Sequence, residues 1–217
     1  MHLGMSDKYP LVNLPYVNRF VNKFVNKAID GKGDSDRHLI SIFAMALASK
    51  GETYVELGVR EGHTTEPLYQ AAWHNGGKLW SVDLNEPTEF KPPSDTLHYQ
   101  FKKQDSIEFL EGWPKHKKMD VVFVDDWHSY EHVKRQLELL DECVGPSSVI
   151  LLHDLMYGNT DPFYHVDLAH HEGQWASGGP YRAVAELNPQ FWEWSTLPWN
   201  NGLTILRKKY SNKYHRR

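Results

Sequence analysis

Four short apolar runs constrain the fold of this chain more than any other feature. They lie at residues 53–57, 79–82, 121–124 and 149–152. Such runs are too short for buried helices, and they lack the polar alternation of a half-exposed strand. Helical patterns at about 65–74 and 130–144 separate them. This strand–helix–strand order predicts an α/β fold: a Rossmann-like, doubly wound and mostly parallel sheet.

The two ends of the chain add further elements. Apolar residues at three- and four-residue spacing predict helices at about 16–29 and 36–49. A helix at about 180–188 precedes two aromatic and β-branched runs, 191–197 and 203–207. These two runs predict an antiparallel hairpin at the C-terminal edge. For the whole sheet we expect about seven strands.

We therefore expect one main domain with an addition at either end. Residues 1–50 would form an N-terminal helical cap, 51–208 the ligand-binding domain and 209–217 a basic tail. The apolar face of the cap helices has to be buried, either on the core over the mouth of the site or in a homodimer interface.

Composition limits the function classes. The chain has 217 residues, which suffice for one sizeable domain, and a net charge of −4, which disfavours nucleic acid and anionic membranes as partners. Cys143 is the only cysteine, so an intrachain disulfide and a multi-thiolate metal site are excluded. No apolar run approaches the ~18 residues of a membrane span, and the N-terminus lacks the apolar core of a signal peptide. These features predict a cytoplasmic protein with a small-molecule ligand.

The segment YVELGVREGHTT carries the strongest local signal. A buried strand runs into Glu56, Gly58 and Gly62, and a glycine turn at the carboxyl end of a parallel strand lets the backbone approach a ligand. The spacing is G-x-x-x-G rather than the G-x-G-x-x-G of dinucleotide sites. Asp83 ends the next strand, where a carboxylate can accept hydrogen bonds from both hydroxyls of a ribose. The pattern predicts a nucleoside ligand, and the alternative is an ordinary turn followed by an unrelated aspartate.

Together with MDVVFVDDWHSY and SSVILLHDL, this segment resembles a known family. Residues about 50 to 208 are similar to class I S-adenosylmethionine-dependent methyltransferases. The resemblance is to small-molecule O-methyltransferases of the catechol and caffeoyl-coenzyme A type, and equally to relatives of macrocin O-methyltransferase. It implies S-adenosylmethionine as cofactor and a hydroxyl of a sugar, polyketide sugar or phenol as acceptor. The residues that it implies for the cofactor are Glu56, Gly58, Gly62, Thr64, Asp83, Asp105, Ser106, Asp125 and Trp127.

The resemblance also implies a reaction centre. Asp125 and Asp154 match the metal-binding aspartates of the catechol enzymes, and His128 takes the place of their catalytic lysine. The family's asparagine after the second aspartate is Leu155 here, and His153 precedes that aspartate.

A physical argument leads to the same place. Asp125 and Asp154 end adjacent strands, so their carboxylates converge with His128 and His153, and two close carboxylates favour a cation or a raised pKa on one of them. We expect Mg²⁺ or another divalent cation on Asp125, Asp154 and His153, and a catalytic role for His128, His153 and Asp125. The alternatives are a metal-free histidine base, or histidines that only cap and pack.

Two other function classes remain open from sequence. One is a metal-dependent hydrolase or hydroxylase-like enzyme that uses the same aspartates and histidines. The other is a non-catalytic S-adenosylmethionine-binding protein. The segment 161–180, rich in histidine and aromatic residues, is expected to form a lid or a substrate wall.

Overall fold

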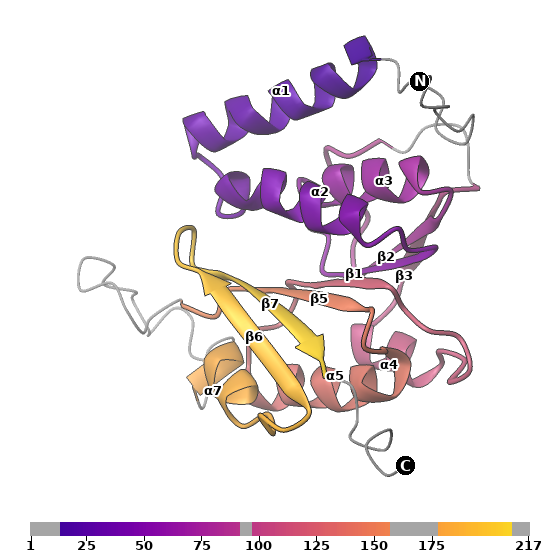
Figure 1. Cartoon of the computed structure of the whole chain (residues 1–217), viewed down its shortest axis with the longest axis vertical. Coiled ribbons are helices and arrows are strands. Elements are labelled where there is room, and N and C mark those ends of the chain that lie inside the picture. The colour runs from indigo at the N-terminus through magenta and orange to yellow at the C-terminus, as the bar shows by residue number, and fades with distance from the viewer. Residues whose placement is uncertain (1–13, 92–96, 157–177, 210–217) are drawn as a thin grey trace, which may run out of the picture.

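The computed structural model describes residues 14–91, 97–156 and 178–209. The expected lid at 161–180 and the basic tail therefore fall almost entirely outside the described residues. Within this part, a seven-stranded sheet has the order β3-β2-β1-β4-β5-β7-β6, with helices on both faces (Figure 1). Its strands are β1 (Thr53–Leu57), β2 (Lys78–Asp83), β3 (Tyr99–Lys103), β4 (Val121–Val124), β5 (Val149–His153), β6 (Trp192–Leu197) and β7 (Leu203–Lys208).

The sheet confirms the predicted topology. Strands β3, β2, β1, β4 and β5 pair in parallel, and β7 pairs antiparallel with both β5 and β6. Every residue of β1 and β4 is buried. That burial on both faces explains why these strands read as continuous apolar runs.

Helices cover the two faces of the sheet as separate layers. One layer contains α1 (Leu14–Asp30), α2 (Leu39–Ala48) and α3 (Thr65–His74). The other contains α4 (Ser106–Glu111), α5 (Tyr130–Cys143) and α7 (Gly179–Ala185). Each layer encloses its own apolar cluster against the sheet. Phe24 of α1 is almost completely buried in the first cluster, so the apolar face of the N-terminal helix packs on the core.

The structure refines several predicted elements. The helix expected at 36–49 is split into a 3₁₀ turn, η1 (Asp36–His38), and α2. The helix expected at about 180–188 already ends at Ala185. The short helix α4 was not predicted from sequence, because six residues are too few for a clear periodicity. Cys143 is a free, buried thiol. Among the described residues, no helix has the length and apolar character needed to cross a membrane.

Candidate active site

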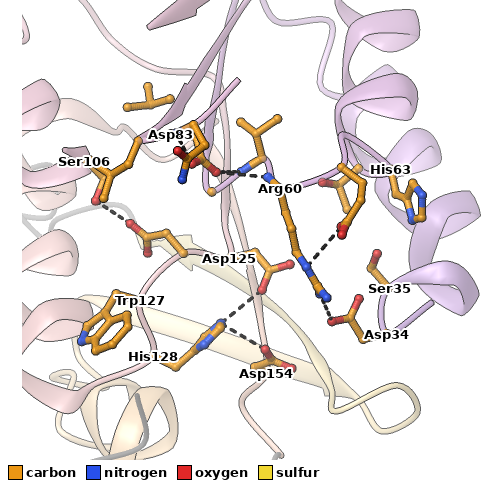
Figure 2. A pocket seen from close by; sticks show the side chains of 18 of the residues that line it. Asp34, Ser35, Arg60, His63, Asp83, Ser106, Asp125, Trp127, His128 and Asp154 are labelled. Carbon is orange, nitrogen blue, oxygen red and sulfur yellow. Dashed lines mark hydrogen bonds and ion pairs between the residues drawn. The ribbon is translucent and has the colours of Figure 1, made fainter. Parts of the chain in front are cut away.

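A cavity of about 860 Å³ opens at the carboxyl ends of the parallel strands. Figure 2 shows side chains from several separate segments facing it. The residues predicted from sequence that line it are Gly58, Thr64, Asp83, Asp105, Ser106, Asp125, Trp127, His128 and Asp154. The sheet edge therefore brings together residues that are nearly 100 positions apart in the chain.

Glu56 does not face the open cavity; its carboxylate is fully buried under the first loop. It accepts hydrogen bonds from Thr64 Oγ1 at 2.8 Å, Thr65 Oγ1 at 2.8 Å and Ser81 Oγ at 2.5 Å. Burial raises the pKa of Glu56 to about 7, although the three hydroxyls oppose the shift. Helix α3 begins at Thr65 without a side-chain cap, and the hydroxyls of Thr64 and Thr65 bond to Glu56 instead.

The two glycines of the motif shape the loop between β1 and α3. Gly58 has a φ of +89°, and a Cβ atom placed there would lie 2.2 Å from the carbonyl oxygen of Asp125. Gly62 also has a φ of +89°, and its Cβ would lie 2.4 Å from Cβ of Phe90. Gly58 therefore allows the loops after β1 and β4 to touch, while Gly62 lies beneath a neighbouring loop and away from the cavity wall.

Asp83 orders the same loop from the end of β2. Its Oδ2 accepts hydrogen bonds from the backbone amides of Val59 at 2.8 Å and Arg60 at 3.1 Å, and its Oδ1 accepts one from the amide of Asn85 at 2.8 Å. Each carboxylate oxygen has two lone pairs, so the two amides occupy Oδ2, whereas Oδ1 can accept one further hydrogen bond from a ligand in the cavity.

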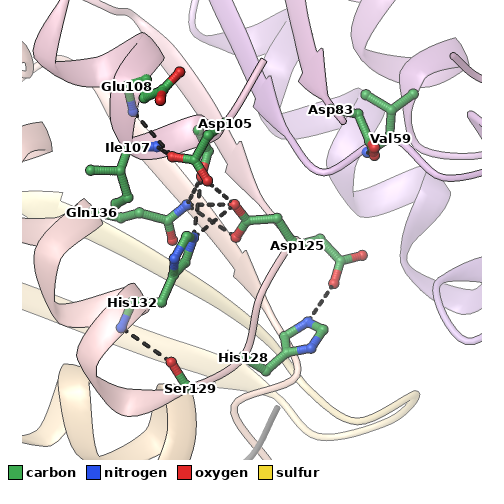
Figure 3. Close-up of polar contacts among 12 residues, drawn as sticks. Val59, Asp83, Asp105, Ile107, Glu108, Asp125, His128, Ser129, His132 and Gln136 are labelled. Atoms are coloured by element: carbon green, nitrogen blue, oxygen red, sulfur yellow. Dashed lines mark hydrogen bonds and ion pairs between the residues drawn. The ribbon is translucent and has the colours of Figure 1, made fainter. Parts of the chain in front are cut away.

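A polar cluster forms the wall next to α4 and α5 (Figure 3). Asp105 caps α4 by accepting hydrogen bonds from two backbone amides. Asp126 is partly buried and also lines the cavity. It accepts hydrogen bonds from Ser106 Oγ at 2.5 Å and Gln136 Nε2 at 2.8 Å, and His132 Nε2 lies 3.1 Å from the same carboxylate. Burial alone would raise the pKa of Asp126, but the hydrogen bond and charge of His132 and the hydrogen bonds from Ser106 and Gln136 together outweigh it and lower the pKa.

Sequence reasoning missed Asp126, His132 and Gln136. The spacing of two of them could have indicated a shared role, because His132 and Gln136 are four residues apart and lie on one face of α5. What the pattern lacked was any indication that this face points to the end of β4 rather than to solvent.

Asp125, His128 and Asp154 meet at the centre of the cavity wall. His128 Nε2 lies 3.3 Å from Asp125 Oδ1 and 3.0 Å from Asp154 Oδ2. Burial opposes a charge on His128, yet its contacts with the two carboxylates raise its pKa to about 10. Burial alone would raise the pKa of both aspartates, but the neighbouring imidazoles hold both below their usual range.

His153 lies behind this group. Its side chain is fully buried, and its Nδ1 lies 3.3 Å from Asp125 Oδ1 and 3.1 Å from Asp154 Oδ1. It does not line the cavity. The two aspartates are thus flanked by one histidine on the cavity side and another on the core side.

The N-terminal region also reaches the cavity, through the segment before η1. Asp34 and Ser35 line it, and Arg60 Nη1 lies 3.0 Å from Asp34 Oδ2 (Figure 2). Arg60 and Asp34 were not singled out from sequence, because no motif links residues from the helical region to the glycine loop.

Comparison with known proteins identifies the domain. Residues 55–155 match the family model described as a methyltransferase domain. The chain carries a methyltransferase domain. The matched segment contains every site residue predicted from sequence, from Glu56 to Asp154. No curated protein matches the sequence.

Solved structures share the fold of this chain. The SAH-bound methyltransferase PaMTH1 of Podospora anserina is 12% identical, with a TM-score of 0.63 over 93% of this chain and 98% of its own. The O-methyltransferase TomG of Streptomyces achromogenes, in complex with SAM, is 13% identical, with a TM-score of 0.58 over 90% and 95%. A putative caffeoyl-CoA O-methyltransferase of Staphylococcus aureus is 12% identical, with a TM-score of 0.58 over 79% and 82%.

Proposed function

We propose that this protein transfers a methyl group from S-adenosylmethionine to a hydroxyl group of a small molecule. The observation that carries the proposal is the meeting of Asp125, His128 and Asp154 on the wall of the cavity that Asp83 and Trp127 also line. A cofactor site and a group suited to activating a hydroxyl thus share one cavity in a methyltransferase domain. Neighbours of the same fold that are named as O-methyltransferases support this acceptor class.

In this proposal the cofactor lies along the carboxyl ends of β1, β2 and β4. Asp83 would accept a hydrogen bond from a ribose hydroxyl at Oδ1. Trp127, which is 44% exposed, would stack against the adenine, whose edge would face Asp105 and Ser106. Gly58 and Thr64 would lie near the methionine portion. Glu56 and Gly62 would act indirectly, by holding the loop that forms this part of the wall.

The residues at the centre fit a divalent cation. One ligand atom from each of Asp125, His128 and Asp154 lies within 4.8 Å of the others. Within the described part of the chain, Asp154 Oδ1 is buried and has no hydrogen-bond partner, although His153 Nδ1 is close to it. Two carboxylates and one imidazole suit Mg²⁺ or Mn²⁺. A cation held by these three residues would lower the pKa of an acceptor hydroxyl.

The two aspartates determine whether His128 carries a proton in this centre. While His128 bridges both carboxylates, its pKa of about 10 keeps it protonated at neutral pH. It can accept a proton from the acceptor only after these contacts weaken. When a cation is held, His128 Nε2 would be one of its ligands and could not also take the proton. For a metal-free centre we assign the base to His128 rather than to His153, which stays behind the aspartates and orients them. Methyl transfer itself depends on holding the acceptor oxygen in line with the sulfonium methyl group.

The first experiment tests the cofactor. Calorimetric titration of the full chain with S-adenosylhomocysteine should show saturable binding, and NAD under the same conditions should show none. Binding of NAD with comparable affinity would remove the proposed function.

Chelation tests the reaction centre. We expect exhaustive chelation to abolish formation of S-adenosylhomocysteine from S-adenosylmethionine with a panel of sugar and phenol acceptors. The affinity for S-adenosylhomocysteine should stay nearly unchanged, because its proposed contacts lie mostly elsewhere. The His128→Ala and His153→Ala proteins are assayed alongside. Full activity in chelator with loss in one histidine variant would establish a metal-free base, and full activity in all three conditions would discard this centre.

A further inference from the structure

A third histidine, His38, lies beside the reaction centre, although it comes from the N-terminal region. It is the last residue of η1 and is fully buried. Its ring packs edge-on against the ring of His153, with 5.5 Å between the centroids and 77° between the planes. Its Nε2 lies 2.5 Å from the backbone carbonyl oxygen of Trp199. A carbonyl oxygen only accepts hydrogen bonds, so Nε2 of His38 carries the proton and donates it.

The contact with His153 matters because of what His153 touches on its other side. Nδ1 of His153 lies 3.3 Å from Asp125 Oδ1 and 3.1 Å from Asp154 Oδ1. The orientation of this ring therefore decides whether it can face both carboxylates together. Within the described residues, His38 is the aromatic ring packed against it.

A second path leads from His38 to Asp154 through the turn between β6 and β7. At one end of the turn, the carbonyl oxygen of Trp199 accepts the hydrogen bond from His38, and the side-chain oxygen of Asn200 accepts one from the backbone amide of Arg37. At the other end of the turn, the carbonyl oxygen of Gly202 accepts a hydrogen bond from the backbone amide of Asp154, at 3.0 Å. Asp154 has a φ of +64°, which is unfavourable for a residue with a side chain, so its backbone needs such support.

We propose that His38 is a positioning residue for methyl transfer. It fixes the orientation of the His153 ring and the position of the turn at 199–202. Through both contacts it holds the carboxylates of Asp125 and Asp154 in place. The inference rests on the proposed function, because it takes this carboxylate pair as the reaction centre. A residue of the helical N-terminal region is thereby part of the catalytic architecture, although it does not touch the cavity.

Three variants separate positioning from general stability. His38→Gln keeps an N–H donor near the carbonyl of Trp199, whereas His38→Leu fills similar space without a donor. His98→Leu is the matched control, because His98 Nδ1 also pairs with a backbone carbonyl, that of Gly77, at 2.7 Å. His98 lies at the amino ends of the strands, on the opposite edge of the sheet from the cavity. If His38→Leu does not fold, His38→Asn takes its place, since its side chain is too short to reach Trp199.

The readouts are the Nδ1–H resonance of His153 in proteins labelled with ¹⁵N-histidine, and the affinities for Mn²⁺ and S-adenosylhomocysteine. The wild-type, His38→Gln and His98→Leu proteins should show a sharp, downfield resonance for this proton. In His38→Leu the resonance should disappear, because the proton exchanges with water once the ring of His153 is no longer held in place. The affinity for Mn²⁺ should fall roughly 10-fold or more in His38→Leu, as expected when a residue that orients a ligand is removed. The affinity for S-adenosylhomocysteine should not change in any variant.

Each other result overturns the inference. An unchanged resonance and unchanged Mn²⁺ affinity in His38→Leu would show that His153 needs no support from His38. Equal losses in His98→Leu, or in His38→Gln, would show that the effect is not specific to the donated hydrogen bond. Failure of the wild-type protein to bind S-adenosylhomocysteine would instead remove the proposed function, so the two failures are distinct.

Discussion

Buried carboxylates of this site differ in the sign of their pKa shifts, because their partners differ. Glu56 is surrounded by hydroxyl groups, which cannot compensate for the loss of water, and its pKa rises to about 7. Asp125 and Asp154 face imidazoles that can carry a positive charge, and their pKa values fall. The site thus combines a carboxyl group that can hold a proton near neutral pH with a pair that stays ionised.

The pKa of Glu56 predicts a pH dependence of stability. In the unfolded chain this group ionises near pH 4.5, whereas in the folded protein it keeps its proton to about pH 7. The folded state therefore binds more protons in this window, so the free energy of unfolding falls as the pH rises from 4.5 to 7, by about 3 kcal/mol from this group. Glu56→Gln should remove that part of the decline.

Urea denaturation at pH 4.5, 6 and 7 measures the effect. Glu52→Gln, at an exposed residue just before β1, is the matched control and should retain the wild-type pH dependence. A Glu56→Gln protein with the same slope as wild type would show that Glu56 ionises normally in the folded state.

The ribose assignment of Asp83 predicts a loss of affinity. Asp83→Ala would remove a ribose hydrogen bond worth about 0.5 to 1.5 kcal/mol together with the three hydrogen bonds that order the loop, so S-adenosylhomocysteine should bind roughly 10-fold more weakly or worse. Asp83→Asn, which keeps one acceptor oxygen, should lose less. Calorimetric titration of both variants checks that Asp83→Ala loses more affinity than Asp83→Asn. An unchanged affinity in Asp83→Ala would remove the ribose assignment.

At the scale of elements, loops that follow different strands hold one another in place. The loop after β1 contacts the loop after β4 at Gly58, and the β6–β7 turn supports the end of β5 at Asp154. These contacts involve backbone atoms and left-handed conformations, so they tolerate little change in side-chain size. The cavity wall is consequently built from a few close approaches between loops.

Gly58→Ala tests this view of the loops. The added methyl group would meet the backbone of Asp125, in addition to the cost of a positive φ. We expect it to lower the free energy of unfolding by more than the roughly 1–2 kcal/mol of the conformational cost alone, and to abolish binding of S-adenosylhomocysteine.

Gly76→Ala provides the matched control. Gly76 has a φ of +71° but nothing within 4 Å of an added Cβ, so only the conformational cost applies. Chemical denaturation and calorimetry of both variants distinguish the two contributions. Equal losses of stability in the two proteins would contradict the close approach at Gly58.

At the scale of the whole molecule, the N-terminal helices belong to the core and also adjoin the site. Phe24 packs in the same cluster as Leu39 and Ile42, against α3 and the sheet. The segment after α1 then supplies Asp34 and Ser35 to the cavity wall, and it places His38 against His153. The N-terminal helices are thus joined to the rest of the described chain by packing.

Deleting residues 1–30 should therefore do more than remove a surface helix. It would expose the apolar residues that α1 covers, at about 25 cal/mol per Å² of newly exposed apolar surface. We expect lower solubility and a lower melting temperature, measured by sedimentation and by circular dichroism. A fully soluble truncated protein of unchanged stability would show that the helix contributes nothing to the core.

The sequence alone determined the sheet and the edge of the sheet where the candidate site residues converge. Buried parallel strands leave continuous apolar runs, and the carboxyl ends of neighbouring strands meet at one edge, so the convergence of Asp125 and Asp154 followed from local patterns. Only the tertiary structure decided that Glu56 turns into the core, that His153 lies behind the aspartates, and that His38 packs against it. Side-chain direction at a strand end depends on which distant segments pack there. His38 and Trp199 are 161 positions apart, and no local periodicity encodes a contact over that separation.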